Sequence, residues 1–355
     1  MKGRLFYIVN ILLAAILLLS CSKTDVLKEP QAYKLAVPSN FPQPESSSTN
    51  PLTIDGIALG RRLFYDVRLS GNNQISCASC HKQDLAFSDG VALSTTGVSG
   101  TTLLRHSPTL INLAWSNNGL FWDGGSTNLE SQAFGPLSAH DEMDQNLYEL
   151  IDELRADPTY IRQFQQAFQQ DISSPNIVKA LAQFQRTIVS ANSRYDKYVR
   201  KEDGGWLSDV EKNGLTLVKQ KCQGCHSSDL FTDNNYHNNG LDATFNEVDH
   251  EGIYLGRYRV SYQLADVGAY KTPTLRNIML TAPYMHDGRF ANIEAVLQHY
   301  AQGVKVSPSL AKGMYQLPNG AAGIALSQTD IQAIIAFLKT LTDEDFIHRK
   351  DLTAP

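Results

Sequence analysis

The sequence predicts an all-α protein of two similar domains, with long loops between the helices. Apolar residues recur at helical spacing in several segments, and a Cys-x-x-Cys-His pattern occurs twice, at 77–81 and 222–226. The chain has 355 residues, and a body of about 300 residues suits two domains with one core each. We place the first domain at 51–205, the second at 206–345 and a short tail at 346–355.

The predicted helices are spread along the whole body of the chain. They cover residues 55–65, 146–155, 159–169, 176–192, 208–220, 293–300 and 327–341. Capping boxes begin at Ser208 and Ser327, whose side chains would accept hydrogen bonds from first-turn amides. The segments 88–102 and 229–246 are rich in Gly, Asn and Ser. Loops of that length are usually functional, and wrapping a large cofactor is a sufficient reason for them.

The two Cys-x-x-Cys-His segments predict two covalently bound haem c groups. Two thiols three residues apart can both add to the vinyl groups of one porphyrin, and the next His places an imidazole nitrogen on the iron. The attachment residues are Cys77, Cys80, Cys222 and Cys225, and the iron ligands are His81 and His226. A zinc site or a redox dithiol is the alternative, but neither requires a His after each cysteine pair. The predicted fold is therefore two cytochrome c-like domains, each with one haem.

The N-terminus resembles the export signal of a bacterial lipoprotein. Two basic residues precede an apolar run at 5–19, and Cys21 follows at the position where lipid is attached. We expect residues 1–20 to be a signal peptide, residues 21–50 to be a flexible tether, and Cys21 to anchor the protein in a membrane of the periplasm or cell envelope. A membrane span is the alternative, but the run is shorter than the roughly 20 apolar residues that a span needs.

Charge and cysteine content limit the partners. The formal net charge is −5, and it becomes −7 when the two basic residues of the signal are removed. Such a protein suits a basic protein partner and not a nucleic acid. Of the five cysteines, four belong to the haem patterns and the fifth to the lipid site, so no pair remains for a structural disulfide.

An internal repeat follows the two haem patterns. In the first half, Pro-Thr-Leu-Ile-Asn112 precedes Trp122-Asp-Gly, and in the second half Pro-Thr-Leu-Arg-Asn277 precedes His286-Asp-Gly. The chain is therefore expected to be a duplicated cytochrome unit.

The register of this repeat predicts that the two haems are unequal. Fourteen residues beyond each anchor, Pro136 of the first half stands opposite Tyr300 of the second. Tyr can bind iron and Pro cannot. One haem should therefore be closed by a protein ligand, and the other should be open to a small oxidant.

Further motifs make the chain resemble the bacterial di-haem cytochrome c peroxidases and their relative, the methylamine-utilisation di-haem enzyme, over roughly residues 52–341. Besides the haem patterns, the shared motifs are Arg105-x-Ser-Pro-Thr, Phe121-Trp-Asp-Gly, Gln132-x-x-Gly-Pro136, Glu142-Met143 and Thr272-Pro-Thr-Leu-Arg-Asn277 leading to Pro283-Tyr-Met-His-Asp-Gly288. The resemblance implies that the first haem reacts with hydrogen peroxide and the second takes electrons from a donor. It also allows a homodimer.

The resemblance assigns three residues to the reaction. Glu142 matches the acid/base residue over the open face of the first haem, where a carboxylate can move a proton between the peroxide oxygens. Trp122 matches the tryptophan between the haems, and Gln132, together with Pro136, matches the lining of the distal pocket. From the local sequence alone, Glu142 could be a solvated residue of an acidic loop, and Trp122 an ordinary core aromatic.

The sixth ligand of the second haem separates branches of the family. Tyr300 aligns with a position that is Met in typical cytochrome c peroxidases and Tyr in the methylamine-utilisation enzyme. A phenolate favours ferric iron, so this haem should have a low potential. Rival ligands are Met279, Met285, Met314 and His299.

Two departures from the family concern the first haem and calcium. Val98 occupies the position where many members have a removable distal His, which predicts an enzyme that needs no reductive activation. His106 stands where the family has a calcium-linked Asn. The carbonyls of Thr281 and Pro283 still match calcium positions, which leaves a weakened calcium site.

The sequence thus predicts a di-haem peroxidase that reduces hydrogen peroxide with electrons from a small donor, such as a cytochrome c or a cupredoxin. One alternative is an enzyme that oxidatively modifies a partner protein, as the methylamine-utilisation relative does. The other is a di-haem electron carrier without enzymatic activity.

Overall fold

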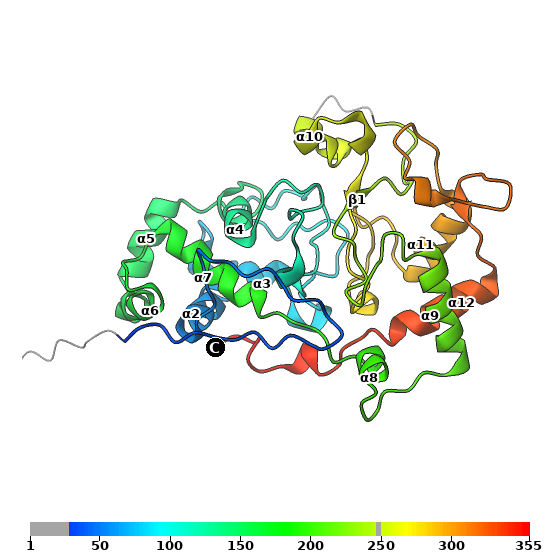
Figure 1. The fold of residues 1–355 in the computed structure, drawn as a ribbon. Coiled ribbons are helices and arrows are strands. Elements are labelled where there is room, and N and C mark those ends of the chain that lie inside the picture. Colours follow the sequence, from blue (N-terminus) through cyan, green and yellow to red (C-terminus); the bar gives the residue numbers. More distant parts are fainter. Residues whose placement is uncertain (1–27, 246–249) are drawn as a thin grey trace, which may run out of the picture.

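The computed structural model describes residues 28–245 and 250–355. The predicted signal peptide and Cys21 lie outside these residues. The chain is mostly helical, as predicted, and its two halves lie side by side (Figure 1). In the described ranges, sheet is limited to two short pairs: β1 (Tyr236–His237) with β2 (Tyr270–Lys271), antiparallel, and β3 (Tyr315–Gln316) with β4 (Gly323–Ile324), parallel. Within the described residues, no helix is both long and apolar enough to cross a membrane.

Each half has its own helices and its own hydrophobic core. The first half contains α2 (Ile54–Phe64), α3 (Cys77–Cys80), α4 (Leu129–Ser138), α5 (Leu147–Arg155), α6 (Pro158–Phe168) and α7 (Ser174–Arg186). The second contains α8 (Arg194–Arg200), α9 (Asp209–Lys221), α10 (Tyr258–Ser261), α11 (Ile293–Gln298) and α12 (Gln328–Lys339). Short 3-10 turns lie at Val67–Leu69, Gln83–Leu85, Leu113–Trp115, His250–Leu255, Leu264–Asp266, Ile278–Leu280, Lys312–Met314 and Phe346–His348.

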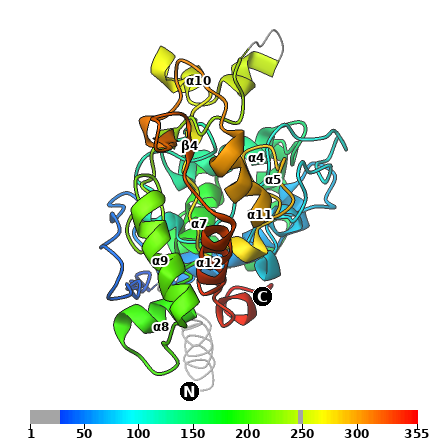
Figure 2. The same cartoon turned by 90° about the vertical axis from the view of Figure 1, so that its right-hand side faces the viewer.

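The two halves repeat the same helix crossing. In the first half α2 packs on α7 (Figure 1), and in the second α9 packs on α12 (Figure 2). A Cβ atom on Gly60 would overlap the Ala180 carbonyl, and one on Gly214 would overlap the Ala333 carbonyl. Only glycine permits this close approach of two helix backbones. The duplication predicted from the sequence is therefore also present in the packing.

Most of the predicted helices are confirmed within a few residues. The Ser208 and Ser327 caps form, with each side chain accepting from the amide three residues later. The sequence pattern did not predict α4 and α8, nor the four-residue helices α3 and α10. In α4, Gly135 and Pro136 interrupt the helical pattern, but Asn128 caps the helix and Pro136 is tolerated in its interior.

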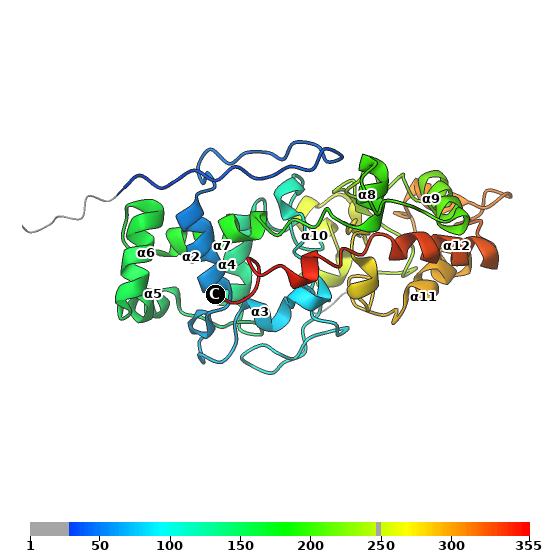
Figure 3. The ribbon, with the colours of Figure 1, turned by 90° about the horizontal axis from the view of Figure 1, so that it is seen from below.

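The flexible tether expected over 21–50 is wrong for its described part, because residues 28–50 pack along the body (Figure 3). Phe41 is buried against Trp115, with ring centroids 5.2 Å apart, and the Trp115 indole donates to the Pro42 carbonyl at 2.6 Å. Asn50 is buried and donates to Glu130 at 2.6 Å. Asn40 and Asn50, two of the polar residues that suggested a tether, thus bond to the body of the protein.

The expected tail at 346–355 also packs on the protein. Phe346 and Leu352 are buried in the core of the first half. The end of the chain therefore returns from the second half to the first.

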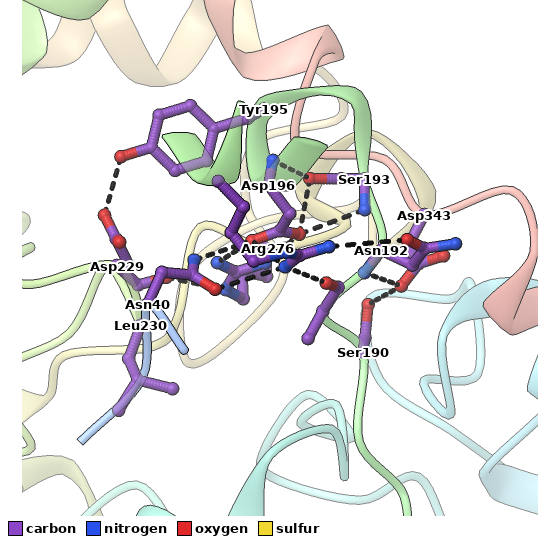
Figure 4. A network of polar contacts seen from close by, with 12 residues as sticks. Asn40, Ser190, Asn192, Ser193, Tyr195, Asp196, Asp229, Leu230, Arg276 and Asp343 are labelled. Atoms are coloured by element: carbon purple, nitrogen blue, oxygen red, sulfur yellow. Dashed lines mark hydrogen bonds and ion pairs between the residues drawn. The ribbon is translucent and has the colours of Figure 1, made fainter. Parts of the chain in front are cut away.

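A buried polar network joins the second half to the N-terminal segment (Figure 4). Arg276 binds Asp196 through both terminal nitrogens, at 2.8 and 2.7 Å, and neither side chain is exposed to solvent. Asn40 donates to Asp196 at 3.0 Å, and the guanidinium of Arg276 lies 4.4 Å from the centre of the Phe41 ring. The charge of each buried group is thus paired and hydrogen-bonded, as burial requires.

A neighbouring set of contacts fixes the segment between α7 and α8 (Figure 4). Ser190 Oγ and the Asn192 amide donate to the buried Asp343 carboxylate at 3.0 and 2.9 Å. Asn277 donates to Ser190 Oγ at 2.8 Å. These bonds hold the connection between the halves against the residues that follow α12.

Candidate haem sites

The first Cys-x-x-Cys-His segment forms the one-turn helix α3, and His81 follows at its end. The Nδ1 atom of His81 is 2.9 Å from the Phe87 carbonyl oxygen. A donor at Nδ1 leaves Nε2 as the ring nitrogen with a free lone pair, and such second-shell bonds orient metal-binding histidines. Burial lowers the pKa of His81, which favours the neutral ring that binds iron.

The second segment begins where α9 ends, with Cys222 as its C-cap. His226 Nδ1 lies 3.0 Å from the Phe231 carbonyl, so the arrangement of His81 is repeated. Thr109 Oγ1 donates to the Ala86 carbonyl at 2.5 Å, and Thr274 Oγ1 donates to the Leu230 carbonyl at 2.6 Å. The Thr of each repeat motif therefore holds the loop that orients the iron-binding His.

Arg276 adds a restraint that only the second half has. Its Nε donates to the Asp229 carbonyl at 2.7 Å, within the loop that leads to Phe231. The equivalent residue in the first half is Ile111, which is buried in the hydrophobic core. The repeat motifs differ in sequence at this position, Ile111 against Arg276, but the sequence pattern alone did not predict that Arg276 holds the loop of the second iron-binding His.

A cavity of about 580 Å³ opens in the second half and extends to the junction. Its lining includes Cys222, Cys225, His226 and Tyr300. Pockets of about 300–1,000 Å³ with mostly apolar walls accommodate cofactors. Arg105 is not part of the lining, but its guanidinium lies 5.2 Å from the centre of the ring of Tyr270, which is. Its buried Nη2 atom has no hydrogen-bond partner among the described residues, as expected of a group that would bind an acidic cofactor substituent such as a propionate. The side chains present therefore fit a haem.

Three of the five candidate sixth ligands of the second haem iron line the cavity. Tyr300, Met285 and Met314 line the cavity, whereas Met279 and His299 are not part of its lining. The ring of His299 is engaged through Nε2 with the Asn239 carbonyl, at 3.1 Å.

Tyr300 stands in an unusual piece of helix. It belongs to the π-helical turn His299–Gly303 that continues α11, and such turns are frequent at functional sites. Asn239 Nδ2 donates to the Tyr300 hydroxyl at 3.3 Å. In the first half, Pro136 lies near the end of α4, so Pro136 and Tyr300 occupy corresponding places after corresponding helix starts at Asn128 and Asn292.

Trp122 lies at the junction between the halves and lines the cavity, as does Gln132. Its indole donates to the His106 carbonyl in the first half, at 2.8 Å. Its own carbonyl accepts from the Lys271 amide in the second half, also at 2.8 Å. The position of Trp122 is therefore fixed from both sides.

Glu142 lies on the side of the first haem segment. It is half-buried, and its charge acts on the thiols of Cys77 and Cys80. Burial, with a smaller contribution from Asp141, raises the pKa of Glu142 to about 7. The amide of Val98 donates to the Glu142 backbone carbonyl at 2.7 Å, so the backbone of Val98 lies beside that of Glu142. A group with this pKa can both take and return a proton near neutral pH.

The residues considered for calcium also meet at the cavity. His106, Thr281 and Pro283 all contribute to its lining. The His106 ring is held at Nδ1 by the Val91 carbonyl, at 2.8 Å. In the described part of the chain, no group of three or more His, Cys, Asp or Glu residues is placed to hold a metal ion.

Known proteins resemble this chain over most of its length. A family model described as di-haem cytochrome c peroxidase matches residues 55–204. The chain is 36% identical over 316 residues to the methylamine utilization protein MauG of Methylorubrum extorquens, covering 87% of this chain and 85% of that protein. It is 32% identical over 293 residues to the cytochrome c peroxidase Ccp of Escherichia coli, covering 82% of this chain and 59% of that protein.

Solved structures show the same relationship. The crystal structure of a MauG-like protein associated with microbial copper homeostasis aligns with a TM-score of 0.79 and 34% identity, covering 91% of this chain and 99% of the other. The diheme peroxidase BthA from Burkholderia thailandensis shares the fold, with a TM-score of 0.70 at 22% identity. With paired haem-type motifs, a repeated core and relatives of this identity over most of its length, the chain belongs to the di-haem cytochrome c peroxidase family.

Proposed function

We propose that this protein is a peroxidase that reduces hydrogen peroxide to water with electrons from a small donor protein. Two haem c groups would be attached covalently, one through Cys77, Cys80 and His81, the other through Cys222, Cys225 and His226. The observation that carries the proposal is the inequality of the halves. Tyr300 lines the cavity in the second half, and the corresponding position of the first half is Pro136. An enzyme of this kind needs one open and one closed iron.

When bound, the haems supply the iron that binds peroxide and stores electrons. Each peroxide takes up two electrons and two protons and leaves as two water molecules. Glu142 receives a proton from one peroxide oxygen and returns it to the other, which departs as water. A pKa of about 7 suits Glu142 both for accepting this proton and for returning it. Gln132 would line the pocket where peroxide binds at the first haem. Trp122, which is fixed between the halves, would lie on the route of electrons between the two haems.

The second half takes up electrons one at a time. His226 and Tyr300 would be the protein ligands of its iron, and a cytochrome c or a cupredoxin would serve as donor. The protein is exported to the periplasm or cell envelope and anchored by lipid at Cys21. The carbonyls of Thr281 and Pro283 are the candidate calcium ligands, and a homodimer is the candidate assembly.

The alternative function, oxidative modification of a partner protein, also has specific support. Tyr300 and Val98 both agree with the methylamine-utilisation branch, and the first relative reported above, 36% identical, carries that name. In this alternative, the same oxidised state of the haems modifies a partner protein. A simple electron carrier, by contrast, is opposed by Pro136, which cannot close the first iron.

Cyanide binding and steady-state turnover test the proposal. We expect the ferric protein to bind one cyanide per chain, and to oxidise reduced cytochrome c or cupredoxin continuously when peroxide is added. Binding of cyanide without turnover would support the protein-modifying alternative, and failure to bind cyanide would support the carrier.

A further inference from the structure

The cavity in the second half reaches the surface at the second Cys-x-x-Cys segment, residues 222–225. Gln223 and Gly224 are exposed between the two cysteines. A Cβ atom added to Gly224 or Gly313 would meet nothing within 4 Å, although both glycines line the cavity. The mouth of the cavity therefore lies beside the cysteines that would carry the thioethers.

Positive charge gathers at this mouth. Lys221, in the last turn of α9, and the exposed Lys312 both line the cavity. Among the described residues, no Asp or Glu lines the cavity, although the chain as a whole has a net charge of −5. We call Lys221 and Lys312 the lysine rim.

The lysine rim is not neutralised within the protein. In the described part of the chain, the lysines that form ion pairs are Lys197 and Lys212. The charge of Lys221 contributes to lowering the pKa of Asp330, but hydrogen bonds from Ser327 are the main cause of that shift.

Cofactor binding does not account for the lysine rim. In a porphyrin of this kind, the vinyl groups that accept cysteines and the propionates lie on opposite edges. Lysines beside Cys222 and Cys225 therefore border the thioether edge, away from the propionates. The third lysine of the cavity wall, Lys271, is used internally, because its Nζ donates to the Asn118 and Asn234 carbonyls at 3.0 and 2.9 Å.

We propose that the lysine rim is the docking surface for an electron-donor protein with an acidic patch. This inference rests on the proposed function, in which the second haem takes electrons from a donor. Each docked donor loses one electron, and two donors serve each peroxide. Complementary charge steers such encounters and raises their rates, and the exposed Tyr315 adjacent to the rim adds apolar contact. The overall charge would favour a basic partner, but the local charge at the electron entry favours an acidic one.

Electron transfer in the reverse direction tests this surface without peroxide. The protein is reduced with dithionite, freed of excess reductant and mixed with an oxidised plastocyanin that carries an acidic patch, or with the strongly basic mitochondrial ferricytochrome c. The variants are Lys221→Glu with Lys312→Glu, and Lys221→Gln with Lys312→Gln. The matched control is Lys34→Glu with Lys350→Glu, which makes the same change in net charge at exposed positions in the N-terminal segment and the tail. Haem content and ferric spectra check that each variant is intact.

We expect the second-order rate with plastocyanin to fall as salt is added, and at low salt to fall about tenfold or more in the Glu variant. The Gln variant should lie between it and the wild type, and the control should stay within about twofold of the wild type. Equal rates for the Glu variant and its control, or a rate that falls with salt only for cytochrome c, would overturn the docking proposal. Failure of the wild type to react with peroxide in a separate experiment would overturn the proposed function instead.

Discussion

The pH dependence of the reaction with peroxide should follow the ionisation of Glu142. Burial raises the pKa of this carboxyl to about 7, with Asp141 adding to the shift. The raised pKa means that the proton-accepting carboxylate is present above pH 7 and is lost as the pH falls below it. With a pKa of about 7, about nine-tenths of the carboxyl is ionised at pH 8 and about one-hundredth at pH 5.

The rate constant for peroxide should therefore fall about 90-fold between pH 8 and pH 5. An ordinary exposed Glu, with a pKa of about 4.3, would change by less than about 1.5-fold over the same range. Stopped-flow spectroscopy of the ferric protein with excess peroxide measures this rate directly. Glu142→Gln should lower the rate at pH 8 by about 100-fold or more, which is the usual effect of general acid–base catalysis, and should abolish the pH dependence.

Asp141→Asn is a matched control, because it removes a neighbouring charge and keeps Glu142. It should shift the midpoint of the pH profile to lower pH without removing the profile, since the Asp141 charge is one cause of the raised pKa. A flat profile from pH 5 to pH 8 in the wild type, or the same profile in Glu142→Gln, would refute the assignment of Glu142.

Two further predictions concern stability. Asp196→Asn should lower the free energy of unfolding of the second half by about 3–5 kcal/mol in urea, because it leaves the fully buried Arg276 charge unpaired. Exposed ion pairs contribute below about 1 kcal/mol, so a loss that small would contradict the burial of this pair. Gly214→Ala should cost about 1–3 kcal/mol by forcing α9 away from the Ala333 carbonyl. Gly224→Ala, with open space at its Cβ, is its control, and equal losses for the two glycines would contradict the close helix crossing.

The sequence was most informative where a local pattern carries its own physical reason. The capping serines at 208 and 327 begin helices because their hydroxyls accept first-turn amides. The haem patterns are local too, and the repeat gave the correspondence of Pro136 with Tyr300. What the sequence left open was the choice among five ligands, and the arrangement of side chains around the cavity removed two of them.

The sequence failed where structure depends on distant contacts. Residues 28–50 have the composition of a linker, but Asn40 bonds to a residue 156 positions away and Asn50 to one 80 positions away. No periodicity within the segment could reveal this. The lysine rim is hidden for the same reason, because Lys221 and Lys312 meet only after the second half has folded.

Ferric electron paramagnetic resonance of the wild type and Tyr300→Phe tests the central claim most directly, which is that one iron is closed by Tyr300 and the other is open. We predict one low-spin and one high-spin signal in the wild type, and a change in the low-spin signal alone in Tyr300→Phe. Met285→Leu and Met314→Leu, at the rival positions that also line the cavity, should leave both signals unchanged. Two low-spin signals in the wild type, or a low-spin signal that Tyr300→Phe leaves unaltered, would contradict the account.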